Sequence, residues 1–236
     1  LGRSHFASAL FCTSSFLYEK HIYVTYKYEA GAWNGPTTTF QGDKLPRTME
    51  KLQKGGETIK TVFYGDSIFT GCDCSGMYDR APYQPILSTV IKESLEEYYN
   101  VTIDMHNPSV GGKDSAWGAE NAVVNCASQN PDLVILSFGM NDGWNEPSKV
   151  RANMQTIIDE TLKVNPNCEF IVVSMMVPNQ SAGFYNNHPH FVEEYAKMPD
   201  ATENENTNIA FANMFAMHEH MLETKDFIAM SGNNIN

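Results

Sequence analysis

The chain has little positive charge and no long hydrophobic run. Its 16 Lys and Arg residues are outnumbered by 28 Asp and Glu residues, which gives a formal net charge of -12 over 236 residues. Nucleic acids and anionic membrane surfaces bind basic faces, so this balance argues against both as partners. No apolar stretch approaches the roughly 18 residues that a membrane-spanning helix needs. The composition therefore favours a soluble globular protein.

Metal-binding motifs are also missing, and cysteines are few. The sequence contains neither His-Glu-x-x-His nor Cys-x-x-Cys, so we expect no metal site and no cofactor. Its five cysteines are an odd number, and Cys72 and Cys74 are too close for an easy structural bridge. This pattern favours reduced thiols and a cytoplasmic location, although a secreted protein stays an open alternative.

The most informative feature present is the end of an apolar run at residues 62–68. The run stops at Gly65, and Asp66 and Ser67 follow at once. Gly65 can adopt backbone angles closed to other residues, so a sharp turn is possible there. If a helix starts next, Ser67 lies at its N-terminus, where free N–H groups favour developing negative charge. An oxygen nucleophile needs this setting, although any strand-to-helix turn can contain the same residues.

Two further segments follow apolar runs in the same way, at residues 106–115 and 139–142. In an open parallel sheet the carboxyl ends of the strands share one edge, and ligands bind there. The three loops would bring together the Ser67 hydroxyl, the Gly112 backbone N–H and the Asn141 carboxamide. A nucleophile with two converging donors is what acyl transfer requires, because its tetrahedral intermediate carries an oxyanion.

These segments make the chain resemble the SGNH hydrolases, the GDSL esterase and lipase superfamily, over residues 57–236. Gly65, Asp66 and Ser67 match the first block of that family, Gly112 the second and Asn141 the third. The resemblance implies that Ser67 is the nucleophile. It also implies that the oxyanion hole consists of the Ser67 and Gly112 N–H groups and the Asn141 side chain.

The chain departs from the family at the last block, Asp-x-x-His, whose histidine is the general base. No Asp in this sequence has a His three residues later. The resemblance places the base beyond Asn236, so this chain is expected to be truncated and could be inactive by itself. His188 and His190, in a predicted loop, are weak stand-ins, because they follow a strand whose end faces the site. His218 and His220 are expected on the surface of a helix.

The order of elements predicts an α/β fold, a three-layer α/β/α flavodoxin-like domain with a parallel sheet, preceded by part of a β-rich, jelly-roll-like domain. We expect residues 1–45 to be the C-terminal part of that β-domain, 46–56 a linker with a short helix at 48–52, and 57–236 the hydrolase domain. Strands are predicted at 6–11, 21–28, 60–64, 101–105, 133–138, 169–174 and 208–212. Helices are predicted at 84–99, from 115, at 148–163, near 191–197 and at 214–225. One apolar stripe is expected in the helix at 84–99, formed by Ile86, Leu87, Val90, Ile91 and Leu95. The helix at 148–163 has apolar residues at helical spacing, namely Val150, Met154, Ile157, Ile158 and Leu162.

Aromatic residues after the three blocks give the only hint of the substrate. Trp117, Trp144 and Tyr78, with Tyr83, could stack on sugar rings, although each could equally pack on the sheet. With the resemblance to two-domain carbohydrate esterases, they favour a serine esterase that removes acetyl from oligo- or polysaccharide through an acyl-enzyme, in a bacterial glycan-degrading context. The alternatives are a non-catalytic glycan-binding pseudoenzyme, and an acyl thioesterase or acyltransferase. The sequence does not decide the oligomeric state.

Overall fold

The structure is a computed structural model of the chain, and it describes residues 27, 29, 31–72, 74–179, 186–205 and 207–224. The strands predicted at 6–11 and 21–28 lie outside these described residues, apart from Lys27. The jelly-roll-like domain therefore stays a prediction.

The centre of the fold is a five-stranded parallel sheet in the order β2-β1-β3-β4-β5. Its strands are β1 (Thr58–Gly65), β2 (Thr102–His106), β3 (Leu133–Ser137), β4 (Glu169–Val173) and β5 (Ile209–Ala212). From β1 the chain first adds β2 on one side, and then crosses over to add β3, β4 and β5 on the other side. The direction in which strands are added therefore reverses between β1 and β3. Such a reversal is a topological switch point, and α/β proteins bind ligands beside it, at the carboxyl ends of the strands.

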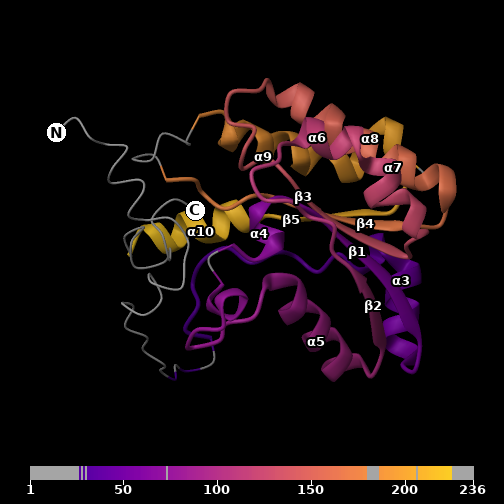
Figure 1. The fold of residues 1–236 in the computed structure, drawn as a ribbon, viewed down its shortest axis with the longest axis horizontal. Coiled ribbons are helices and arrows are strands. Elements are labelled where there is room, and N and C mark those ends of the chain that lie inside the picture. Colours follow the sequence, from indigo (N-terminus) through magenta and orange to yellow (C-terminus); the bar gives the residue numbers. More distant parts are fainter. Residues whose placement is uncertain are drawn as a thin grey trace.

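Helices cover both faces of this sheet (Figure 1), which confirms the predicted three-layer α/β/α arrangement. One face carries α3 (Pro46–Lys54) and α5 (Leu87–Tyr99). The other carries α6 (Ser115–Glu120), α7 (Ala122–Asn125), α8 (Pro147–Val164) and α9 (His188–Lys197). Two more helices, α4 (Ser67–Thr70) and α10 (Met214–Leu222), follow the carboxyl ends of β1 and β5. Short 3-10 turns lie at Gly42–Lys44 (η1), Ser75–Tyr78 (η2), Ala127–Gln129 (η3), Met198–Asp200 (η5) and Thr202–Asn204 (η6).

The strands are buried on both faces, as expected for a parallel sheet between helical layers. Along β1, Val62 and Tyr64 belong to the core beneath α8, whereas Ile59 and Phe63 belong to the core beneath α3 and α5. Helix α8 contributes Val150, Met154, Ile157 and Ile158, which are all fully buried. These are four of the five positions that its helical periodicity predicted, and the fifth, Leu162, is half-buried against the same core. Across the described residues, no helix combines the length and the apolar character that crossing a membrane requires.

Helix α5 is shorter than predicted, and its buried face differs. The predicted stripe included Leu87 and Val90, yet both side chains are exposed. Ile91 and Leu95 do pack on the sheet, but the fully buried residue of the helix is Ser88, whose hydroxyl accepts a hydrogen bond from Asn107 Nδ2 at 3.1 Å. A satisfied polar group has displaced the apolar residues from this part of the interface.

The segment predicted as a linker contains α3, which is longer than the expected helix and packs on β1 and α5. Pro46 begins the helix, and Thr48 and Leu52 are buried. Glu169, the first residue of β4, accepts hydrogen bonds from the Arg47 and Thr48 N–H groups at 2.9 and 2.7 Å. These N–H groups have no partner within the helix, so a carboxylate from the sheet caps it.

Candidate active site

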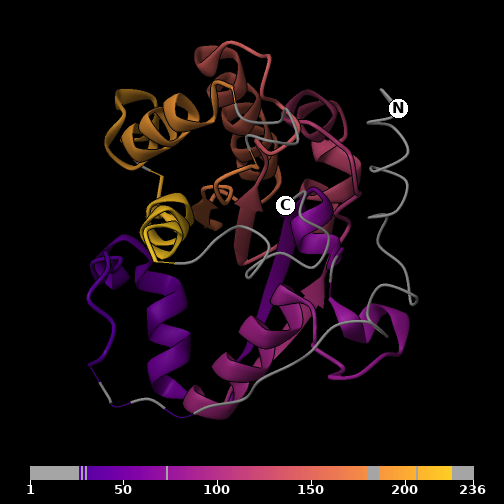
Figure 2. The ribbon, with the colours of Figure 1, turned by 90° about the vertical axis from the view of Figure 1, so that its left-hand side faces the viewer.

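The three predicted loops all leave the carboxyl edge of the sheet, which faces the viewer in Figure 2. They connect β1 to α4, β2 to α6, and β3 to α8. The geometry of each loop is fixed by contacts with the next, so the three form one connected site.

Ser67 is the first residue of α4 and is half-buried. The preceding residue, Asp66, caps this short helix, since its Oδ1 accepts a hydrogen bond from the Ile68 N–H at 3.0 Å. Among the described residues, neither the Ser67 hydroxyl nor its backbone N–H has a hydrogen-bond partner. The hydroxyl is therefore presented at the edge of the sheet without being engaged by the fold.

Gly65 is needed for close approach rather than for special backbone angles. Its φ does not lie in the left-handed region, contrary to the turn geometry that the sequence suggested. A Cβ atom at this position would lie 2.2 Å from the carbonyl oxygen of Ser137 on β3. Glycine therefore lets β1 and β3 stay paired up to the residue that precedes the Asp66-Ser67 turn.

The second loop lies directly against Ser67. A Cβ atom on Gly111 would lie 3.8 Å from the Ser67 Cβ. Gly112 has a φ of +75°, which favours glycine, and the space around its missing Cβ is open. No described residue accepts a hydrogen bond from the Gly112 N–H. Ser109 ties this loop to β1, because its hydroxyl accepts from the Gly65 N–H at 3.0 Å and donates to the Phe63 carbonyl at 3.1 Å.

The third loop is tied to the second by Asn141 and Asp142. Asn141 Nδ2 donates to the Lys113 carbonyl at 2.9 Å, which leaves the second hydrogen of the amide for another acceptor. Asp142 is buried and accepts from the Ser115 hydroxyl at 2.6 Å and from the Ser115 N–H at 3.0 Å. Asn145 Nδ2 donates to the same carboxylate at 3.0 Å.

Two buried carboxylates lie at this edge, and burial raises the pKa of both. Burial raises the pKa of Asp66 to about 7, opposed by the hydrogen bond from Ile68, and the nearby charge of Asp142 adds to the rise. Burial also raises the pKa of Asp142, while the Ser115 hydrogen bonds oppose it. Asp66 Oδ2 is buried and has no hydrogen-bond partner among the described residues. Carboxyls with perturbed pKa values are typical of functional sites.

The sequence predicted a loop at His188 and His190, but both residues lie at the beginning of α9. His190 is exposed and lies 3.5 Å from Glu193. His188 is fully buried, and both of its ring nitrogens contact the backbone. Nδ1 accepts from the Asn186 N–H at 3.3 Å, and Nε2 lies 3.0 Å from the Met140 carbonyl oxygen. Burial lowers the pKa of His188, which favours the neutral ring.

His218 and His220 are not surface residues, so that prediction is wrong. Both are half-buried on α10. His218 Nδ1 accepts a hydrogen bond from the Val177 N–H at 3.0 Å, and His220 packs edge-on against Trp33 at a centroid distance of 5.2 Å. Two sides of α10 are therefore in contact with the rest of the protein, which residue spacing alone does not reveal.

The four predicted aromatic residues differ in how far they are exposed to solvent, and therefore to a ligand. Trp144, at the end of the third loop, is 82 % exposed. Trp117 is half-buried on α6, packs against the core beside Tyr64, and has Lys113 Nζ 5.6 Å from its ring. Tyr78 is half-buried in η2, and Tyr83 is exposed. Trp144 is therefore the most exposed of these four aromatic residues, and Trp117 contributes to the core.

Sequence reasoning missed the residues that hold the loops in place. Ser109, Ser115 and Asp142 lie inside the segments that the sequence singled out, but their roles depend on partners 27 to 46 residues away. Among the described residues, no group of three or more His, Cys, Asp or Glu side chains is arranged to hold a metal ion.

Comparison with known proteins adds a family and a set of similar folds. The model of the GDSL-like lipase/acylhydrolase family matches residues 63–230. No curated protein matches the chain. Among solved structures, a two-domain esterase active on acetylated mannans, crystallised with mannopentaose, is 15 % identical with a TM-score of 0.60, and the match covers 82 % of this chain and 48 % of that one.

A second solved structure is a catalytic mutant of an acetylxylan esterase from Geobacillus stearothermophilus. It is 17 % identical, has a TM-score of 0.58, and is matched over 77 % of this chain and 87 % of its own. At these identities the likeness establishes the fold alone. This chain spans about half the length of the two-domain mannan esterase.

Proposed function

Because the chain belongs to the GDSL-like lipase/acylhydrolase family, we propose that it is a serine esterase that removes small acyl groups, acetyl in particular, from carbohydrate. One observation carries the proposal. At the carboxyl edge of the sheet, the unengaged hydroxyl of Ser67 lies beside the loop of Gly111 and Gly112, and no described residue binds the backbone N–H groups of Ser67 and Gly112. An acyl-transfer site needs such a nucleophile and such donors.

In the proposed reaction, Ser67 Oγ attacks the ester carbonyl carbon while its proton passes to a general base. The oxyanion accepts hydrogen bonds from the Ser67 and Gly112 N–H groups and from the free hydrogen of Asn141 Nδ2. Collapse of the intermediate breaks the ester bond, and the alcohol leaves with the proton. Water then attacks the acyl-enzyme in the same way and releases the carboxylic acid.

The general base is the part of this mechanism that neither His188 nor His190 supplies. His188 is buried and uses both ring nitrogens for backbone contacts, so it has no lone pair to offer Ser67. His190 is exposed beside Glu193. The family resemblance assigns the base to the histidine of an Asp-x-x-His block, a motif that does not occur in this sequence.

Acetylated carbohydrate is the substrate class that we favour. The similar folds include esterases that act on acetylated mannans and an acetylxylan esterase, which supports this class without establishing it at 15 to 17 % identity. Trp144 supports it independently, because an exposed indole beside the third loop can stack on the apolar face of a sugar ring.

A second candidate function is a non-catalytic glycan-binding protein on the same fold. It is favoured by the absence of an Asp-x-x-His motif from the sequence. Without its base, a serine hydrolase retains only a small part of its rate. The two candidates share the fold and the carbohydrate ligand, and they differ in turnover.

Acetate release from acetylated xylan and mannan, by the protein with its natural C-terminus, distinguishes the candidates. We expect turnover that Ser67→Ala abolishes and that the matched variant Ser128→Ala leaves unchanged, since Ser128 is exposed in η3. Glycan binding without turnover would contradict the esterase and favour the binding protein. Hydrolysis of acyl thioesters but not of sugar esters would instead indicate a thioesterase.

A further inference from the structure

The loop that carries Asn141 is held by the beginning of α9 and by one residue of its third turn. Tyr195 donates its hydroxyl hydrogen to the Phe138 carbonyl at 3.1 Å. The Asn187 N–H donates to the Gly143 carbonyl at 3.2 Å, and Asn187 Nδ2 donates to the Asn145 carbonyl at 2.9 Å. Residues on both sides of Asn141 are thus fixed to the same helix.

His188 makes the contact nearest to Asn141 itself. Because its Nδ1 accepts from the Asn186 N–H, the proton of the neutral ring lies on Nε2, which donates to the Met140 carbonyl at 3.0 Å. This carbonyl belongs to the same planar peptide unit as the Asn141 N–H. A hydrogen bond to it therefore fixes the orientation of the backbone from which the Asn141 side chain projects.

The setting of His188 makes this hydrogen bond well defined. The side chain is fully buried and packs edge-on against Phe191 at a centroid distance of 5.5 Å. A buried ring with both nitrogens engaged has one tautomer and one orientation available to it. Packing alone does not explain why the Nε2–H group of His188 points at the carbonyl of Met140, the residue that precedes Asn141.

We infer that His188 is a positioning residue, which holds the Met140–Asn141 peptide so that the Asn141 carboxamide points at the developing oxyanion. The inference rests on the proposed function. Asn141 already donates one amide hydrogen to the Lys113 carbonyl, so the side chain is held from one end by the second loop and from the other by α9. Loss of either support lets the remaining donor drift from the oxyanion.

An oxyanion forms only in the transition state, so a misplaced donor lowers kcat and leaves KM nearly unchanged. In His188→Phe the ring stays but the donor is lost, and we expect kcat for nitrophenyl acetate to fall about 10- to 100-fold, since small misplacements have effects of that order. His188→Gln, which keeps a donor near the position of Nε2, should recover part of this loss. The matched variant His190→Phe changes an exposed histidine two residues away and should have no effect.

A double-mutant cycle with Asn141→Ala tests whether His188 acts through Asn141. Once the carboxamide is gone, His188→Phe should lower kcat by no more than about twofold further, because the two changes remove the same interaction. If the phenylalanine variant does not fold, His188→Met, which is also apolar and more adaptable, takes its place in the cycle. Thermal unfolding of each variant shows that the folded protein is assayed.

Independent, multiplying effects of the two substitutions in an active enzyme would overturn this inference alone, and so would a rise in KM at unchanged kcat. Absence of Ser67-dependent turnover in the unmodified protein would overturn the proposed function, and the role of His188 with it. The cycle and the Ser67→Ala control therefore separate the two failures.

Discussion

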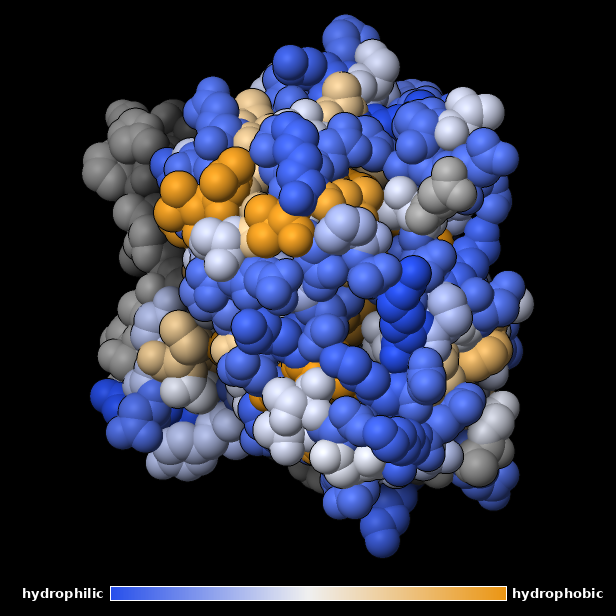
Figure 3. Space-filling model, turned by 90° about the vertical axis from the view of Figure 1, so that its right-hand side faces the viewer, coloured by the Kyte–Doolittle hydropathy of each residue, from blue (hydrophilic) through white to orange (hydrophobic). Residues whose placement is uncertain are grey.

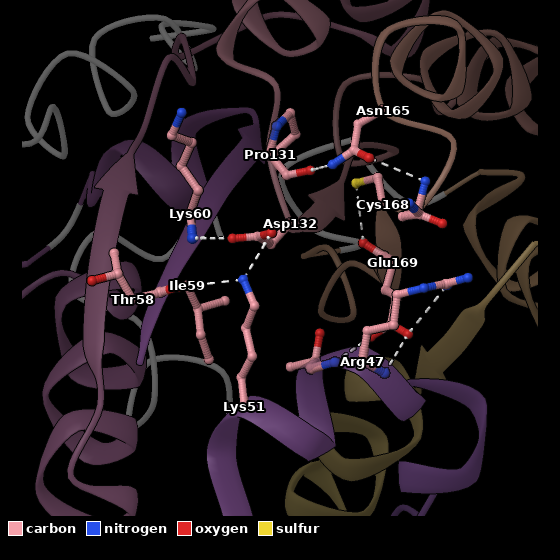
Figure 4. A network of polar contacts seen from close by, with 12 residues as sticks. Arg47, Lys51, Thr58, Ile59, Lys60, Pro131, Asp132, Asn165, Cys168 and Glu169 are labelled. Carbon is pink, nitrogen blue, oxygen red and sulfur yellow. Dashed lines mark hydrogen bonds and ion pairs between the residues drawn. The ribbon is translucent and has the colours of Figure 1, made fainter. Parts of the chain in front are cut away.

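The buried carboxylates at the two edges of the sheet differ in the partners that surround them. At the amino edge, the Glu169 side chain is fully buried and lies against Arg47 (Figure 4). Both of its oxygens accept hydrogen bonds, from the Arg47 and Thr48 N–H groups and from Asn208 Nδ2. Asp132 lies in the same network, 2.9 Å from Lys51 Nζ and 2.9 Å from the Lys60 N–H. The molecular surface on this side is mostly hydrophilic, with a hydrophobic group in its upper part (Figure 3).

At the carboxyl edge, Asp66 and Asp142 are also buried, but within the described residues neither forms an ion pair with a Lys, Arg or His. Asp66 even leaves one oxygen without a hydrogen-bond partner there. Burial therefore raises the pKa of both carboxyls. The contrast indicates that the amino edge is arranged to hold α3 on the sheet. The carboxyl edge instead buries two carboxylates without a cationic partner among the described residues, as active sites often do.

The largest expected effect is on catalysis at the carboxyl edge. Asn141→Ala removes a proposed donor to the oxyanion and should lower kcat roughly 100- to 1000-fold. The half-buried side chain of Asn141 makes one hydrogen bond, so the unfolding temperature should change little. Steady-state kinetics with nitrophenyl acetate and thermal unfolding measure the two quantities. A loss of activity that merely follows a loss of folded protein would remove Asn141 from the site.

Asp66→Asn tests, through the pH dependence of stability, whether burial raises the pKa of Asp66. The folded-state pKa of Asp66, about 7, lies above its unfolded value of 3.8, so between these values the folded protein binds more protons than the unfolded chain. The raised pKa of Asp66 therefore makes its full contribution to stability below pH 3.8, and this contribution is lost as pH rises through 7. As pH rises from 5 to 8, this loss lowers the free energy of unfolding by about 2 to 3 kcal/mol.

Asparagine cannot ionise, so urea unfolding of Asp66→Asn should show a flatter dependence on pH, and the variant should be the more stable protein at pH 8. The matched variant Asp104→Asn, at an exposed position on β2, should keep the pH dependence of the unmodified protein. Parallel pH profiles for Asp66→Asn and the unmodified protein would show that Asp66 is ionised in the fold at neutral pH.

Glu169→Gln tests the compensated charge at the amino edge. Glutamine replaces one acceptor with an amide group, which then opposes an N–H group of α3 or the Asn208 amide. The unfolding free energy should fall by about 1 to 3 kcal/mol, because a buried donor loses its partner. Esterase kcat, measured where the variant is fully folded, should stay within about twofold of the unmodified value. A larger drop in kcat would mean that the two edges are coupled.

Trp144→Ala has the smallest expected effect and compares the edges as binding surfaces. Trp144 and Tyr98 are equally exposed, at 82 and 81 %, but Tyr98 lies near the end of α5, beside the amino edge. Trp144→Ala should raise KM for acetylated oligosaccharide about three- to tenfold through lost stacking, and leave KM for nitrophenyl acetate unchanged. Tyr98→Ala should change neither value. Equal effects of the two substitutions would argue against a sugar contact at Trp144.

Much of the fold followed from the sequence because it depends on local patterns. Apolar runs ending in Gly or polar residues predicted the ends of β1, β2 and β3, and the register of the parallel sheet then brought their loops together. The stripe of α8 was predicted correctly because Val150, Met154, Ile157 and Ile158 all face the core, and Leu162 packs against it. The same reasoning failed for α5, where a hydrogen bond from Asn107 to Ser88 decides which side is buried.

What the sequence could not predict depends on partners far along the chain. Glu169 reads as an ordinary strand residue until α3, more than 120 positions earlier, places its N–H groups on the carboxylate. His188 looks like a possible base in a loop, yet burial and a contact with Met140, 48 residues away, turn both nitrogens toward the backbone. Long-range burial and hydrogen bonding, rather than residue type, decide the roles of these side chains.

The most direct test of the central claim is covalent trapping of Ser67. A fluorophosphonate reacts with an activated serine and leaves a stable phosphonyl ester whose position mass mapping of peptides can assign. In protein that hydrolyses nitrophenyl acetate, the account predicts one equivalent of label on the peptide that contains Ser67, and no labelling of Ser67→Ala. Label on a different residue, or equal labelling of Ser67→Ala, would contradict the assignment of Ser67 as the nucleophile.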